Sequence, residues 1–182
     1  GIMHILAISG LHVGLILLFL NTTLFFITGT KTLQTLRTLL VVLLLWVYAW
    51  MTGFSPSVVR ATMMFSFFTL GQLTSRKANS YNILAFTAFV MLMLNPYNMF
   101  EVGFQLSFLA VLSILFFYPK IYGLLRFRYF IPDKSWQIIS VSLAAQILTF
   151  PLTIFYFHQF STWFLLANLI AIPVVFLIVL TS

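Results

Sequence analysis

The sequence predicts an all-α membrane protein, a polytopic bundle of about seven transmembrane helices with some short or broken ones. Three observations predict this class. The 182 residues are 62% hydrophobic and only 6% charged, whereas a soluble domain carries about 25% charged residues. Apolar runs such as residues 39–47 are continuous, without the alternation of a membrane β-barrel strand. Backbone groups in lipid must be paired internally, so continuous runs favour helices.

Seven hydrophobic segments are expected to form the helices, because about 20 apolar residues cross a hydrocarbon core about 30 Å thick. The second and fourth segments are short for a crossing. The breaks between segments contain turn residues such as Gly29, Gly53, Asn95 and Pro132. The segments cover residues 11–29, 36–52, 57–74, 80–94, 102–119, 136–156 and 162–181.

The chain is expected to be one membrane-embedded domain over residues 1–182, with no soluble domain. Because it begins at Gly1, without an initiator Met or a signal-peptide pattern, we expect a piece of a longer protein. The chain has no cysteine, which excludes disulfides and thiolate metal sites.

Basic residues predict the orientation. If all seven segments cross, eight of the nine Lys and Arg residues lie in or beside the first, third and fifth loops, on one face of the membrane. The positive-inside rule makes that face cytoplasmic, with the N-terminus outside and the C-terminus inside. This asymmetry explains the net charge of +7 without a nucleic-acid surface. The eight residues are Lys31, Arg37, Arg76, Lys77, Lys120, Arg126, Arg128 and Lys134.

Arg60 and Glu101 are charges that lipid tolerates poorly. An arginine at the centre of a membrane helix costs about 2.5–3.5 kcal/mol on insertion scales, so Arg60 is expected to face protein or water. Two interpretations stay open: a role in a transport pathway, or a structural role by snorkelling or by pairing with Glu101.

Polar side chains also follow helical spacing in three segments. Ser142, Gln146, Thr149 and Thr153 lie along one face of the sixth segment, and residues 62, 66 and 69 along one face of the third. Gln105 extends the polar face of Glu101. Hydrogen bonds between helices and the lining of an aqueous cavity both explain such stripes. On the second interpretation, the stripe of the sixth segment is water-accessible, and Leu143 and Ile147 are not.

Several motifs resemble the competence domain of the ComEC family of DNA-internalisation proteins. Residues 4–13 read HILAISGLHV, and residues 101–108 read EVGFQLSF. Shorter matches in the same order are PSVVRA at 56–61, Asn95-Pro96, Phe150-Pro151 and ANL at 167–169. The resemblance covers nearly the whole chain. One departure is Glu101, where the family usually has Asp, so a carboxylate is retained.

The resemblance implies a bacterial inner-membrane channel that conducts single-stranded DNA into the cytoplasm during natural transformation. Its partners would be single-stranded DNA, the bilayer, other domains of the full-length protein and other competence proteins. Together with the polar residues, the resemblance gives candidates for the DNA path or its outer mouth. These are His4, Ser9, His12, Arg60, Glu101, Gln105, Ser142, Gln146, Thr149, His158 and Asn168.

Three other functions compete with this one. Ser9, in the run AISG, and His158 resemble parts of an intramembrane serine hydrolase, although the first Gly of its G-x-S-G motif is missing. His4, His12, His158 and Glu101 are possible metal ligands without a recognised spacing. A small-molecule permease fits the composition equally well. We expect no enzyme activity, no cofactor and no metal.

Overall fold

A computed structural model describes residues 10–26, 29–73, 79–125 and 130–158. Over these residues the chain forms six α-helices and two short 3-10 helices, and no strand. The predicted all-α class is therefore confirmed. The chain divides into two compact units, Gly1–Asn98 and Met99–Ser182, which we call the N-terminal and the C-terminal unit.

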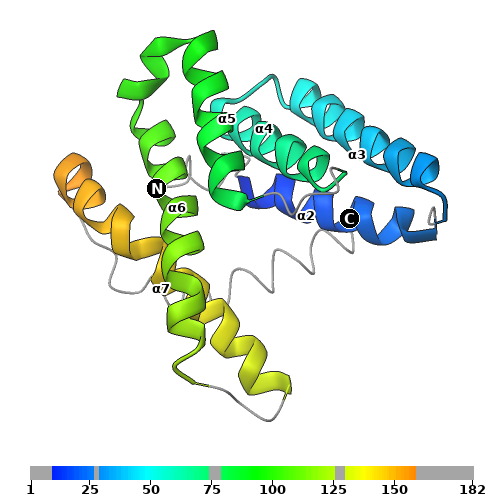
Figure 1. The fold of residues 1–182 in the computed structure, drawn as a ribbon. Helices are drawn as coiled ribbons and strands as arrows, with labels where there is room; N and C mark the ends of the chain where they lie inside the picture. The colour runs from blue at the N-terminus through cyan, green and yellow to red at the C-terminus, as the bar shows by residue number, and fades with distance from the viewer. Residues whose placement is uncertain (1–9, 27–28, 74–78, 126–129, 159–182) are drawn as a thin grey trace. The chain divides into compact units, whose positions relative to one another are not determined.

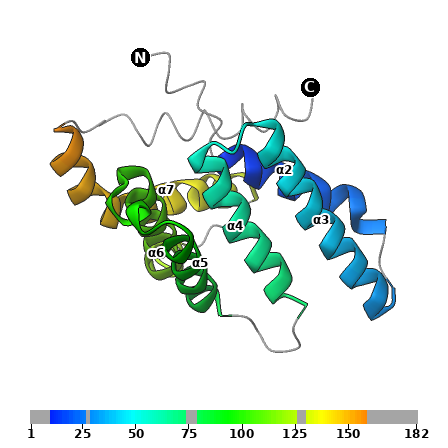
Figure 2. The same ribbon diagram turned by 90° about the horizontal axis from the view of Figure 1, so that it is seen from above.

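The N-terminal unit is built around α4 (Pro56–Gly71). This helix contacts α2 (Gly10–Thr23), α3 (Lys31–Met51) and α5 (Ser80–Leu94). A 3-10 helix, η1 (Leu24–Phe26), follows α2. Figure 2 shows α4 between α3 and α5. A core of aliphatic side chains joins α2, α3 and α4, and it consists of Val13, Val41, Leu45, Ala49 and Val58.

Local sequence explains where these helices start and how they approach. The Thr30 side chain accepts a hydrogen bond from the Leu33 amide and caps α3. Pro56 begins α4, where its missing N–H costs nothing. A Cβ on Gly10 would lie 3.4 Å from Ala61 Cβ, so a larger side chain there would push α2 away from α4.

The C-terminal unit pairs α6 (Val102–Tyr122) with α7 (Phe130–Phe157), and these two helices contact each other extensively (Figure 1). The 3-10 helix η2 (Pro96–Phe100) precedes α6 and spans the boundary between the units. Pro119 and Pro151 lie inside α6 and α7, which both stay helical past the proline.

The surface of the chain is apolar, and many of its buried side chains are polar. Phe26, Met51, Phe100 and Phe155 are among the large exposed side chains, whereas Arg60 and several Ser and Thr residues are buried. Water would penalise this distribution, and lipid favours it. Such a distribution is typical of a membrane protein.

The described residues contain fewer candidate spans than predicted. Within the described residues, three helices are long and apolar enough to cross a membrane: α3, α6 and residues 132–157 of α7. The helices α2 and α5, of 14 and 15 residues, reach only about 21–23 Å at 1.5 Å per residue, and α4 is interrupted by polar side chains. The seventh predicted segment, 162–181, lies outside the described residues.

Two predicted boundaries were also wrong. The second segment was expected to be short, but α3 starts at Lys31 and has 21 residues, because Thr30 caps it and polar residues extend its first turns. The break expected at Pro132 lies inside α7, which starts at Phe130. Proline is tolerated in a first helical turn, where no N–H is needed. The fourth segment is short, as predicted.

Candidate functional site

Arg60 lies in the second turn of α4 and is only 7% exposed. It shares a face of this helix with Phe67, seven residues later, and the Phe67 ring packs edge-on against Phe86 of α5, 5.0 Å between centroids. Arg60 therefore lies on the side of α4 that faces α5. A buried guanidinium in so apolar a chain requires polar surroundings to offset its desolvation.

The predicted stripe of the third segment is also buried, on another face of α4. Thr62, Ser66 and Thr69 follow Val58, a member of the core shared with α2 and α3. Thr69 donates a hydrogen bond to the Phe65 carbonyl. The hydroxyls of Thr62 and Ser66 have no hydrogen-bond partner among the described residues. Arg60 and this stripe therefore do not form one cluster.

Glu101 occupies the N-cap position of α6, directly before its first residue, and is exposed. Gln105, one turn later, donates to the Met99 carbonyl at 2.8 Å and accepts from the Tyr156 hydroxyl at 3.2 Å. Its amide thus joins the segment before α6 to the end of α7. Arg60 belongs to the N-terminal unit and Glu101 to the C-terminal unit, so their pairing stays a prediction.

The polar stripe of α7 is packed inside the unit. Ser142 is 6% exposed and Thr149 is buried, while Ile147 is 42% exposed. An exposed Ile147 can face lipid, so the expected water accessibility of the stripe stays a prediction. Thr149 donates to the Ala145 carbonyl, and Thr153 donates to the Thr149 carbonyl, both at 2.8 Å. These hydroxyls satisfy their hydrogen bonds within their own helix. Gln146, on the same face, is half-buried.

Sequence reasoning missed Ser113, which lies in the middle of α6. Its buried hydroxyl donates to the Ala144 carbonyl and accepts from the Leu148 amide at 3.3 Å. Both partners are backbone groups of α7. In the sequence, the only sign of this contact was a single hydroxyl residue inside the apolar run of α6.

A second missed group joins the opposite end of the α6–α7 pair. The Tyr122 hydroxyl donates to both carboxylate oxygens of Asp133, at 2.9 and 3.1 Å. Trp136 donates through Nε1 to the Tyr122 carbonyl at 3.3 Å, and Gln137 donates to the Tyr122 hydroxyl at 3.4 Å. Lys120, near this end, lies 3.6 Å from the centroid of the Phe116 ring.

Both described lysines of the C-terminal unit lie at one end of its helix pair, where Asp133 also lies. In the C-terminal unit, Lys120 and Lys134 lie where α6 ends and α7 begins, and Glu101 and His158 lie at the other ends of these helices. In the N-terminal unit, Arg37 donates to the Asn21 carbonyl at 2.7 Å, near the end of α2. In the C-terminal unit, both lysines therefore lie at the same end of the helix pair.

The remaining candidates are less informative. His12 lies in α2 and is half-buried, and His158 is exposed directly after α7, with a φ of 51°. His4, Ser9 and Asn168 lie outside the described residues. The serine-hydrolase alternative therefore stays untested. The described part of the chain contains no group of three or more potential metal ligands from His, Cys, Asp and Glu.

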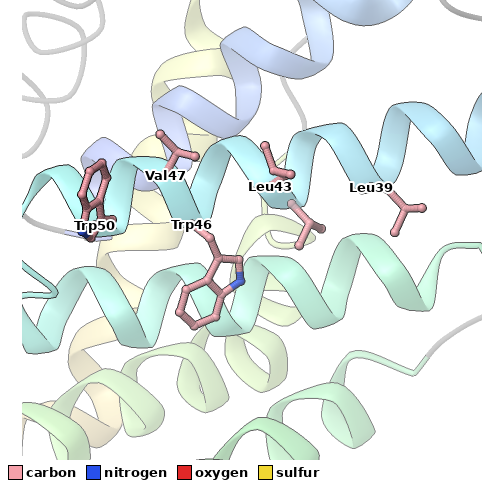
Figure 3. Close-up of a pocket in the computed structure, with 6 residues that line it drawn as sticks. Leu39, Leu43, Trp46, Val47 and Trp50 are labelled. Atoms are coloured by element: carbon pink, nitrogen blue, oxygen red, sulfur yellow. The ribbon is translucent and has the colours of Figure 1, made fainter.

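An open, almost wholly apolar groove runs along the outer face of α3. Figure 3 shows Leu39, Leu43, Trp46, Val47 and Trp50 along this helix. Val42 completes the lining. The face differs from the one that Val41 and Leu45 bury in the core. The lining is apolar except for the indole N–H groups of Trp46 and Trp50, and such a lining suits lipid chains.

The family model described as Competence protein matches residues 1–182. ComE operon protein 3 of Bacillus subtilis is 35% identical over 174 residues, which are 95% of this chain and 21% of that protein. An uncharacterized protein of Aquifex aeolicus is 37% identical over 115 residues, 63% of this chain and 26% of that protein.

Recombination protein 2 of Haemophilus influenzae is 30% identical over 182 residues, 94% of this chain and 23% of that protein. The chain thus spans about a fifth to a quarter of the length of these curated relatives. No solved structure matches it significantly.

Proposed function

We propose a role in DNA uptake for this chain, because it belongs to the Competence protein family, whose model it matches over residues 1–182. Competence is the state in which bacteria take up DNA, and the family match carries the proposal. The finer proposal is a membrane channel that conducts single-stranded DNA, with further domains of a longer protein as partners. The chain itself has no proposed catalytic step.

The interior polarity of the chain supports a conducting role. A strand that crosses the membrane needs positive charge to offset phosphate, and polar groups that contact any base or sugar. Arg60 supplies a buried cation, and Thr62 and Ser66 supply buried hydroxyls without partners among the described residues. Such groups are costly in lipid unless the protein uses them.

We further propose a cytoplasmic-membrane location, with the basic loops inside and the end of the C-terminal unit near Glu101 outside. The positive-inside rule gives this orientation, and the separation of Lys120 and Lys134 from Glu101 along α6 and α7 supports it.

An uptake assay tests the proposal. A strain in which the gene for the protein is deleted should fail to bring labelled DNA into the cytoplasm, while DNA still binds at the cell surface. The gene should restore entry. Normal DNA entry in the deletion strain, with a lost capacity to import a small solute, would instead indicate a permease.

A further inference from the structure

The middle of α7 has a weakened backbone hydrogen-bond ladder. Pro151 has no N–H, so the Ile147 carbonyl loses the donor that an ordinary residue would place four positions later. One turn earlier, the Ser113 hydroxyl of α6 bonds both the Ala144 carbonyl and the Leu148 amide. These are the acceptor and the donor of a single rung of the α7 ladder.

Both features are known physical causes of helix kinks. Sharp bends occur at proline and where a side chain inserts into the ladder. Hydroxyls that bond the carbonyl four residues earlier, as Thr149 and Thr153 do, also bend helices. Figure 1 shows the α7 ribbon changing direction between its yellow and its orange part. Three contributions to bending therefore coincide within residues 144–153.

The two parts of α7 are attached to α6 in different ways. The first part is fixed by the half-buried contacts of Tyr122 with Asp133, Trp136 and Gln137. The far part is joined to α6 by the bond from Tyr156 to Gln105, between two side chains near the surface. A bond of this kind opens at little cost, whereas the first part would have to break several.

We infer that α7 contains a hinge at residues 144–151, set by Ser113 and Pro151, and that the Tyr156–Gln105 hydrogen bond is the latch of the far part. When the latch opens, residues 152–158 swing relative to α6 and expose the Gln105 amide. This motion is a property of the helix pair and does not require that the protein transport DNA. The inference goes beyond a static channel, because residues 152–158, near Glu101, would take two positions relative to α6.

Spin-label distances test the hinge, and the lack of native cysteine makes labelling specific. One pair, Leu112→Cys with Phe155→Cys, reports on the far part of α7, and both positions are exposed. A control pair, Leu112→Cys with Lys134→Cys, reports on the fixed part. The distances are measured on the whole chain in lipid nanodiscs by pulsed electron–electron double resonance, without DNA.

The far pair should give two distance populations, and the control pair one. Tyr156→Phe should raise the population of the open form about threefold, the average worth of one hydrogen bond between membrane helices. Pro151→Ala with Ser113→Ala should restore the ladder and leave the far pair with one narrow distance. Ser113→Thr, which retains the hydroxyl, should keep both populations.

A single far-pair distance, identical in the starting chain, Tyr156→Phe and Pro151→Ala, would overturn the hinge. If the control pair broadens together with the far pair, α7 moves as one body and the hinge is also wrong. Pro151→Ala alone decides the matter if the Ser113→Ala variant does not fold.

Discussion

The Tyr156 hydroxyl donates a hydrogen bond of 3.2 Å to Gln105 Oε1, across 51 residues of sequence. Gln105 also donates to the Met99 carbonyl at 2.8 Å. The side chain of Gln105 therefore joins three segments of the C-terminal unit: the end of η2, the start of α6 and the end of α7. These two bonds give a structural reason for a glutamine at this position of the EVGFQLSF motif, and this reason does not require contact with DNA.

We predict that the bonds of Gln105 contribute separately to stability. Tyr156→Phe should lower the free energy of unfolding by about 0.6 kcal/mol, the average for a hydrogen bond between membrane helices. Gln105→Ala should cost more, because it also removes the bond to the Met99 carbonyl. Unfolding in mixed micelles measures both changes, and Tyr97→Phe, at an exposed side chain, is the control.

A double-mutant cycle separates the shared bond from each side chain's other contacts. The combined Tyr156→Phe and Gln105→Ala change should cost less than the sum of the two single changes. Additive effects would mean that the bond contributes nothing to stability.

We predict that Thr62→Val stabilises the fold. The Thr62 hydroxyl is buried and lacks a hydrogen-bond partner among the described residues, and burying a hydroxyl without a bond costs about 1–3 kcal/mol. Valine keeps the branched shape and removes this cost, so the free energy of unfolding should rise by about 1 kcal/mol. The same unfolding experiment measures it.

Thr87→Val is the matched control, because Thr87 is equally buried but donates to the Ile83 carbonyl at 2.7 Å. This change should not stabilise the protein. If Thr62 lines the DNA path, Thr62→Val should raise stability and lower transformation together. If both stability and transformation rise, the Thr62 hydroxyl is only an unsatisfied buried polar group and does not line a DNA path.

Much of the helical fold follows from the sequence, and the reason is local. Pro56 at a helix start and continuous apolar runs place the starts of α4 and α6 within a few residues, whereas the start of α3 was predicted too late because the Thr30 cap was not recognised in the sequence. The predicted number of spans was wrong because a hydrophobic segment need not form a helix that crosses the membrane. The helix α2 is too short to cross, and α4 contains the charged residue Arg60.

The contacts between helices could not be predicted in the same way. A stripe such as Ser142 and Thr149 has the same spacing whether it lines water or packs inside the protein. Ser113 is a single hydroxyl, and only the antiparallel register of α6 and α7 brings it to Ala144. Its partners are backbone atoms, which carry no sequence signal. Contacts between side chains and backbone can therefore be predicted only when the alignment of the two helices in space is known.

We predict that the loop after α6 is cytoplasmic and that the turn after α5 is external. Lys120 and Lys134 flank the first, whereas Asn95 and Tyr97 lie in an uncharged turn. A reporter that is active only outside the cytoplasm should be active when fused at Tyr97 and inactive when fused at Gly123. Activity at Gly123 would reverse the proposed orientation.

The last prediction concerns Arg60, whose charge should be required for DNA entry. A guanidinium that is only 7% exposed costs several kcal/mol unless it is paired or hydrated, and a protein that needed only apolar packing there would have an aliphatic residue. Arg60→Gln should abolish transformation, and Arg60→Lys should retain part of it.

If Glu101 is the partner, Arg60→Gln should also lower membrane abundance, and the combined Arg60→Gln and Glu101→Gln change should restore abundance but not transformation. Immunoblots of membranes and transformation frequencies, measured on the same cultures, separate folding from transport. Normal abundance with normal transformation in Arg60→Gln would show that the charge is dispensable, and recovery of transformation in the double variant would show that the pair only holds helices together.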